Sequence, residues 1–108
     1  MPEETGTAKG FVGPEEVKIT REPNKKLAVN KKSITLSKKA QDRASWQLVG
    51  GGEFTIEFET KLPFGEKTYN EQTAISLRPL PEAEERPYKY TVNVPGHDPL
   101  DPEVIVNN

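Results

Sequence analysis

The sequence predicts an all-β fold, a Greek-key β-sandwich of about seven to eight strands. Three observations support this prediction. Apolar and polar residues alternate with a period of two in short runs, as they do on strands that are buried on one face. Turn-forming segments separate these runs at spacings of about ten residues. The 10 Pro and 8 Gly of the 108 residues leave little room for long helices.

The expected strands follow one another along the chain. The clearest one is 53–59, where Phe54, Ile56 and Phe58 alternate with polar residues. The other runs share this alternation and a bias towards β-branched and aromatic side chains. They cover 17–20, 27–29, 34–36, 46–48, 75–77, 88–94 and 104–106. Trp46 stands in one of these runs, and we therefore expect it at the centre of the core.

The segments between the runs are expected to be turns and connections. Gly50-Gly51-Gly52 is typical of a flexible hairpin loop that leads into the 53–59 strand. Segment 37–45 has some helix propensity but no apolar stripe, which favours a surface turn. The stretch 60–72 is the longest connection, and we expect a short helical turn or a loop that crosses between the sheets.

Length and composition limit the domain organisation. We expect residues 1–14 to form a flexible N-terminal tail and residues 15–108 a single β-sandwich domain. The first ten residues lack the apolar region of a signal peptide, so a cytoplasmic protein is expected if Met1 is the native start. No apolar run approaches the roughly 18 residues needed to span a bilayer, and no membrane partner is expected.

The residue inventory excludes several kinds of chemistry. The chain has no cysteine and one histidine, so disulfides, thiolate metal sites and cysteine nucleophiles are excluded. No serine motif lies near His97 to form a nucleophile and base pair. We therefore predict a protein that is not an enzyme and has no cofactor.

The residues best suited to bind a metal ion share one short loop. They are His97, Asp98 and Asp101, which could hold a divalent ion weakly. The alternative reading is structural, because each aspartate precedes a proline and such Asp side chains bond nearby backbone amides in turns. We prefer the structural reading and expect no metal site.

Charge is distributed unevenly along the chain. Segment 24–43 holds seven basic residues against one acidic residue, Asp42. Such a segment is compatible with an anionic partner or with self-association. For the charge pattern alone we prefer solvated turns and exposed strand edges, because lysine discourages edge pairing. No aromatic residue interleaves with these lysines, so no nucleic acid is expected. The predicted interaction surface comprises Lys25, Lys26, Lys31, Lys32, Lys38 and Lys39, on two neighbouring strands and their turns.

Two segments together resemble the cupredoxins, the blue-copper β-sandwich family. The first is Ile34-Thr35-Leu36-Ser37-Lys38-Lys39-Ala40-Gln41-Asp42-Arg43-Ala44-Ser45-Trp46, followed by Phe54-Thr55-Ile56-Glu57-Phe58. The second is Tyr88-Lys89-Tyr90-Thr91-Val92-Asn93-Val94-Pro95-Gly96-His97, followed by Asp101 and Val104-Ile105-Val106. The resemblance spans about residues 27–107. It implies a cupredoxin-like or immunoglobulin-like sandwich.

The copper ligands of that family are not present. A blue-copper site needs two imidazoles and a thiolate, usually with a weak axial methionine. The resemblance places Phe54 where the first His stands, Val92 where the Cys stands and Asp101 where the Met stands. Only His97 matches, so the resemblance implies a degenerate scaffold without a type 1 copper site.

These observations predict a non-catalytic domain that serves protein interaction or a structural role, with another protein as the possible partner. The alternative is a module that binds a small ligand, a sugar or a weakly held metal ion through the 50–52 and 95–101 loops. A sugar site needs an exposed aromatic platform, for which Tyr69 and Tyr88 are the candidates. The sequence leaves the oligomeric state open.

Overall fold

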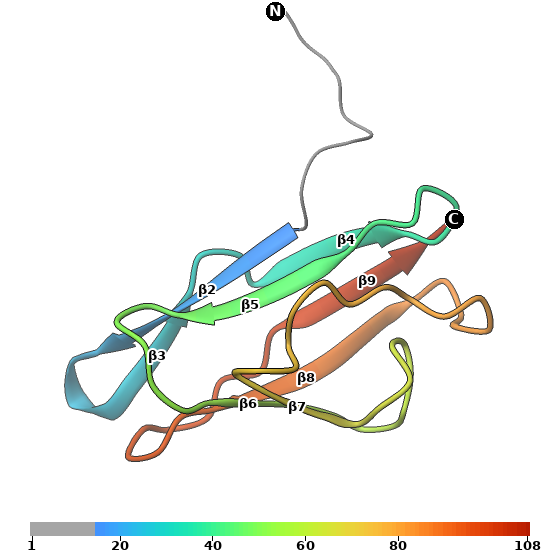
Figure 1. Ribbon diagram of the computed structural model, residues 1–108. Helices are drawn as coiled ribbons and strands as arrows, with labels where there is room; N and C mark the ends of the chain where they lie inside the picture. The colour runs from blue at the N-terminus through green and yellow to red at the C-terminus, as the bar shows by residue number, and fades with distance from the viewer. Residues whose placement is uncertain (1–14) are drawn as a thin grey trace, which may run out of the picture.

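The computed structural model describes residues 15–108. The tail expected at residues 1–14 lies outside the described residues. Two mixed β-sheets pack face to face, which confirms the prediction of an all-β sandwich (Figure 1). The eight strands of the described part are β2 (Glu15–Glu22), β3 (Lys26–Val29), β4 (Ser33–Ser37), β5 (Ala44–Leu48), β6 (Thr55–Phe58), β7 (Thr68–Asn70), β8 (Pro87–Asn93) and β9 (Glu103–Asn107).

The sheets differ in size and in strand direction. The smaller has the order β3-β2-β5, with β2 antiparallel to β3 and parallel to β5. The larger has the order β4-β9-β8-β6-β7, where β4 and β9 are parallel and the remaining pairs antiparallel. A single 3-10 turn, η2 (Pro23–Lys25), joins β2 to β3. No helix of the described residues is long and apolar enough to cross a membrane.

The core lies between the sheets and is built from alternate residues of each strand. Trp46 is 2% exposed, which confirms its expected place. Its indole packs edge-on against Tyr90, with ring centroids 5.4 Å apart, and against Phe64 at 6.1 Å. The indole Nε1–H donates a hydrogen bond to the Tyr90 hydroxyl (3.1 Å). A buried aromatic cluster of this kind stabilises the fold through both its area and its edge-to-face geometry.

The strand predicted at 75–77 is wrong. Ile75 is 56% exposed, and the segment lies along β5 as irregular chain. The alternation of Ile75 and Leu77 imitates a strand, but only Leu77 forms a bridge, with Ala44. The eighth strand is instead β7, which lies within the 60–72 stretch that was expected to be a connection.

The hairpin expected at Gly50–Gly52 is also wrong. The preceding strand β5 and the following strand β6 belong to different sheets, so these glycines cross between the sheets. Gly50, Gly51 and Gly52 have φ values of 86°, 81° and 115°. Glycine adopts such backbone angles at little steric cost. Residues 38–41 form a turn, as expected.

Candidate functional site

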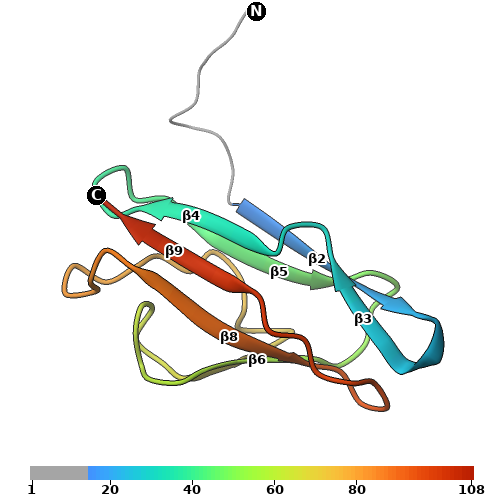
Figure 2. The same cartoon turned by 180° about the vertical axis from the view of Figure 1, so that it is seen from behind.

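One side of the sandwich is formed by two edge strands that follow one another in the chain. β3 is the outer strand of the smaller sheet and β4 the outer strand of the larger sheet. Only residues 30–32 connect them, so both edges face the same side, and Figures 1 and 2 show them in succession along the molecule. We call this surface, formed by residues 25–39, the basic side.

Backbone groups of β4 point away from the sheet on the basic side. The Glu103 N–H donates to the Lys32 carbonyl (2.9 Å) and the Lys38 N–H donates to the Asn107 carbonyl (2.8 Å). These two bonds and the pairing of Ser33 with Glu103 show that the N–H and C=O groups of Ile34 and Leu36 point towards β9. The N–H and C=O groups of Ser33 and Thr35 therefore point outward, and no backbone partner for them exists among residues 15–108.

The opposite side of the sandwich is closed along part of β5. The Ala44 N–H donates to the Leu77 carbonyl (2.8 Å), the Leu77 N–H returns a bond to Ala44 (2.8 Å), and the Trp46 N–H donates to Ala74 (2.9 Å). Segment 71–77 thus satisfies three outward groups of β5, while the Thr68 backbone on β7 points outward without a backbone partner among residues 15–108. At the end of β7, the Asn70 N–H donates to the Thr73 hydroxyl (2.8 Å). The two sides consequently differ in how much backbone they leave accessible.

The lysines predicted as an interaction surface lie at or beyond the ends of the strands on the basic side. Lys25 ends the turn η2 and Lys26 begins β3, Lys31 and Lys32 lie in the link between the sheets, and Lys38 and Lys39 follow β4. Their expected placement on two neighbouring strands needs correction. The strands concerned, β3 and β4, follow one another along one side but belong to different sheets.

Three of these lysines contact other groups. Lys26 pairs with Asp98 (3.2 Å) and Lys31 with Glu15 (2.9 Å), and both pairs are solvent-exposed. Exposed ion pairs contribute about 0–1 kcal/mol, so they leave these lysines free to exchange partners. The Lys38 ammonium donates to the Ala83 carbonyl (2.7 Å).

The other three lysines carry the accessible charge of the basic side. Lys25, Lys32 and Lys39 are exposed and form no salt bridge with any residue of 15–108. The one acid of the segment, Asp42, accepts a hydrogen bond from the Ser37 N–H (2.9 Å) and so serves the turn after β4. The basic side therefore presents unneutralised positive charge beside open backbone.

The weak metal candidates bind separate partners. The Nδ1 atom of His97 lies 3.2 Å from the Pro95 carbonyl oxygen, within its own turn. Asp98 pairs with Lys26, and Asp101 accepts a hydrogen bond from the Thr91 hydroxyl (2.9 Å). No three His, Asp or Glu side chains of the described residues gather around a common point that could hold a metal ion.

The positions that the cupredoxin resemblance aligns with copper ligands belong to the core. Phe54 is 3% exposed and Val92 is fully buried. Neither side chain offers a nitrogen or sulfur atom to a metal. Both residues therefore act in packing.

The loops at 50–52 and 95–101 lie at one end of the sandwich, because the first residue of β6, Thr55, pairs with the last residue of β8, Asn93 (Figures 1 and 2). A groove of about 420 Å³ opens at this end. Phe54, Val94 and Pro95 form its apolar lining, and its polar lining is Glu53, Thr55, Asn70, Glu71 and Asn93.

The aromatic platforms expected near this end are not available. Tyr69 is 6% exposed and Tyr88 is 4% exposed, so neither ring presents a stacking face. The Tyr69 hydroxyl accepts a bond from the Glu66 N–H (3.0 Å), and the Tyr88 hydroxyl accepts one from the Glu84 N–H (2.8 Å). The Arg86 guanidinium covers the Tyr88 ring at 4.1 Å. The prediction of an exposed Tyr69 or Tyr88 is therefore wrong.

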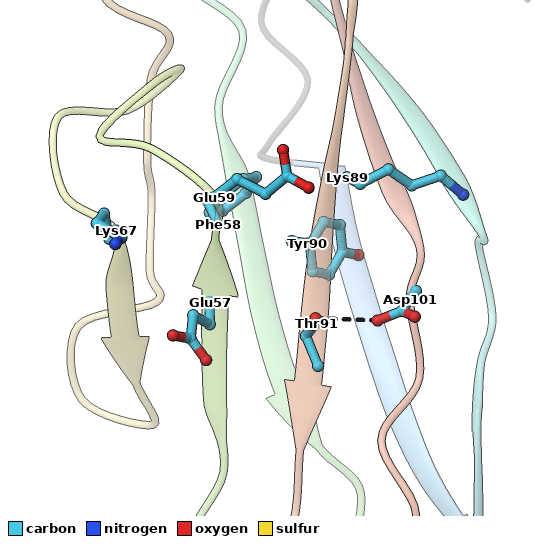
Figure 3. A pocket seen from close by; sticks show the side chains of 8 residues that line it. All are labelled: Glu57, Phe58, Glu59, Lys67, Lys89, Tyr90, Thr91 and Asp101. Atoms are coloured by element: carbon cyan, nitrogen blue, oxygen red, sulfur yellow. Dashed lines mark hydrogen bonds between the residues drawn. The ribbon is translucent and has the colours of Figure 1, made fainter.

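A second groove, of about 460 Å³, crosses the outer face of β6 and β8 (Figure 3). Its exposed lining mixes both signs of charge: Glu57, Glu59 and Asp101 with Lys67 and Lys89. Phe58 and Tyr90 also line it but are buried, so their side chains belong to the core. Such a mixed, open surface offers no selective charge to a ligand.

The titratable groups with displaced pKa values are core tyrosines. Burial raises the pKa of Tyr90 to about 12, although the hydrogen bond from Trp46 opposes the shift. Burial also raises the pKa of Tyr69. Both shifts follow from desolvation of the phenolate, and they identify packing residues rather than acid or base catalysts.

Comparison of the chain with models of protein families, with curated proteins and with solved structures gave no significant match. Arguments about its function therefore rest on the sequence and on the geometry above.

Proposed function

We propose that the protein is a non-catalytic β-sandwich that binds an acidic protein through its basic side. The scaffold would be a Greek-key, cupredoxin-like one that lacks the copper ligands. One observation carries the proposal: the six lysines of residues 25–39 lie on the side of the sandwich where the edge backbone of Ser33 and Thr35 is open. Charge and accessible backbone thus coincide on one surface, and both attract a partner.

The chemistry of this surface favours protein over nucleic acid. Lys25, Lys32 and Lys39 supply accessible ammonium groups for carboxylates. The aromatic rings of the described residues are buried, so single-stranded nucleic acid would find no stacking platform beside the lysines. An acidic protein needs no such platform.

The test compares two triple variants of equal charge. Lys25→Gln/Lys32→Gln/Lys39→Gln removes charge from the basic side. Lys61→Gln/Lys67→Gln/Lys89→Gln removes the same charge elsewhere. Each protein captures partners from extract of its native host at low and high salt, and cross-linking maps the contacts. We expect the basic-side variant alone to lose an acidic partner that cross-links to residues 25–39, because screened charges act mainly on the encounter rate. Equal capture by both variants, or cross-links confined to another face, would contradict the proposal.

The groove at the loop end supports a second candidate function, the binding of a small ligand. Phe54 and Val94 belong to the core, so the exposed carboxylates of Glu53 and Glu71 define the chemistry of the groove, which suits a small cationic molecule. Native mass spectrometry with and without added divalent metals and small amines tests this candidate. A bound species that Glu71→Gln abolishes would support it, and the bare mass under every condition would reject it.

A further inference from the structure

We propose that β4 accepts an extended acidic segment of the partner as an added antiparallel or parallel strand, held by backbone hydrogen bonds and flanked by lysines. This inference rests on the proposed function and specifies how the partner binds. It starts from the alternation of backbone direction along β4, which leaves four backbone groups, on Ser33 and Thr35, directed away from β9.

The open stretch of β4 has defined ends. The next outward-facing residue, Ser37, is already satisfied, because its N–H donates to the Asp42 carboxylate (2.9 Å) and its carbonyl accepts from the Asp42 N–H (3.1 Å). A visiting strand would therefore form up to four hydrogen bonds, with Ser33 and Thr35. The side chains of Ser33 and Thr35 are small, polar and exposed, so they do not obstruct a neighbouring strand.

Charge decides the chemistry of the added segment. Lys31 and Lys32 precede the open stretch and Lys38 and Lys39 follow it, and of these Lys32 and Lys39 form no salt bridge within residues 15–108. A strand rises about 3.3 Å per residue, so a segment of roughly six to eight residues reaches both lysine pairs. The fitting partner has alternating small or β-branched residues in the middle and Asp or Glu at both ends.

Other edges of the sandwich suit an added strand less well. On β3, Leu27 and Val29 also direct backbone groups outward. Just before this strand, however, the Asp98 N–H donates to the Lys25 carbonyl (2.7 Å), and the Asp98 carboxylate pairs with Lys26, which lowers the positive charge at that edge. The edge of β5 is bonded to Ala74 and Leu77. A second copy of this chain would bring its own lysines against these ones, which disfavours self-association through β4.

The probe is a fluorescent octapeptide, Glu-Glu-Thr-Val-Thr-Val-Glu-Glu, titrated against the 108-residue protein and followed by anisotropy. Thr35→Pro removes an outward N–H of β4 and leaves the bonds to β9 intact, because proline is tolerated on an edge strand whose N–H faces solvent. Thr68→Pro is the matched control on β7. The Phe58 N–H donates to the Lys67 carbonyl, so Phe58 and Lys67 are a hydrogen-bonded pair. The neighbouring pair, Glu57 and Thr68, is then not hydrogen-bonded, and the Thr68 N–H and C=O point away from β6. Near-UV circular dichroism checks that both variants fold.

We expect Thr35→Pro to bind the peptide at least about tenfold more weakly than the wild type and Thr68→Pro to bind it equally well. Two N-methylated versions of the peptide test the wild type without any change to the protein. One carries methyl groups on the odd-numbered amide nitrogens and the other on the even-numbered ones. Because only one of these sets can face β4, one version must lose binding and the other must retain it. Lys32→Gln/Lys39→Gln should weaken binding at low salt and make no difference at high salt.

Several outcomes would overturn the strand addition. They are no binding by the wild type, equal binding by both methylated peptides, equal binding by Thr35→Pro and wild type, and a wild-type dimer that Thr35→Pro converts to monomer. If Thr35→Pro binds normally while the lysine variant binds weakly, strand addition fails and the basic docking surface remains. If the lysine variant also binds normally, the proposed function fails with it.

Discussion

Trp46 shows how one residue connects the two sheets. Its strand, β5, belongs to the smaller sheet, while its ring neighbours Tyr90 and Phe64 come from β8 and the chain between β6 and β7. Because the indole is 2% exposed, its removal leaves a cavity that these rings cannot fill completely. The nearby Tyr90 hydroxyl would also lose its donor.

We expect Trp46→Ala to lower the free energy of unfolding by about 3–5 kcal/mol, the usual range for deletion of a large buried aromatic. Urea unfolding monitored by circular dichroism measures this change. A variant that melts within a few degrees of the wild type would show that the indole is not part of the core.

Tyr90 makes stability depend on alkaline pH. Its folded pKa is raised to about 12, mainly by burial, whereas an unfolded tyrosine ionises near about pH 10. Above about pH 10 the unfolded chain releases this proton and the folded chain retains it. Ionisation therefore lowers the free energy of the unfolded state relative to the folded state. The contribution of Tyr90 is therefore complete below about pH 10 and declines towards pH 12.

We expect stability to fall by about 1.4 kcal/mol per pH unit from this group alone between about pH 10 and 12. The measurement is urea unfolding over that pH range, with Tyr90→Phe as the control. An identical pH dependence in Tyr90→Phe would contradict the assignment, because the variant has no phenol at this position.

At the scale of the element, the crossing at Gly50–Gly52 is fixed by an arginine from the neighbouring strand. The Arg21 guanidinium donates to the Gly51 carbonyl (2.8 Å) and the Val49 carbonyl (3.3 Å). A Cβ at Gly52 would lie 2.6 Å from Arg21 Nη2, whereas a Cβ at Gly51 would meet no atom within 4 Å. Both glycines have positive φ, so alanine is strained at either.

We expect Gly52→Ala to be less stable than Gly51→Ala by about 1 kcal/mol, because only the former displaces Arg21 from its carbonyl partners. Urea unfolding of both variants measures the difference. In an Arg21→Ala background the difference should vanish. Persistence of the same difference there would show that the arginine is not its cause.

The elements also show what the sequence could predict. The predicted strands with three or four alternating apolar residues, 53–59 and 88–94, coincide with β6 and β8 to within two residues at each end, because burial of one face leaves a period of two. β7 was missed because it has three residues and a single buried side chain, Tyr69. Segment 75–77 was misassigned because Ile75 and Leu77 alternate, although their backbone closes β5 instead of forming a strand.

Pairing between strands was beyond sequence reasoning. The lysines of the basic side were identified from composition alone, but alternation cannot say whether β3 and β4 share a sheet. Likewise, burial of Tyr69 and Tyr88 depends on which strands cover them. The period-two pattern predicts that one face of each strand is buried. Tyr69 and Tyr88 lie on the buried faces of β7 and β8, which becomes evident once the pairing of these strands is known.

At the scale of the whole molecule, the account depends on an asymmetry between two sides of the sandwich. Segment 71–77 bonds to three outward groups of β5, while the outward groups of Ser33 and Thr35 on β4 find no backbone partner among residues 15–108. The basic lysines stand on the second side. Partly closed backbone on one side and more open backbone beside lysines on the other would direct an acidic partner to β4.

Residue-resolved amide hydrogen exchange by NMR tests this asymmetry most directly. The account predicts strong protection for Ala44 and Trp46 on the closed side and for Ile34 and Leu36, whose amides face β9. It predicts rapid exchange for Ser33 and Thr35, and a slowing of Thr35 when the acidic peptide is added. Protection of Thr35 as strong as that of Leu36 in the free protein would contradict the open edge and, with it, the proposed mode of binding.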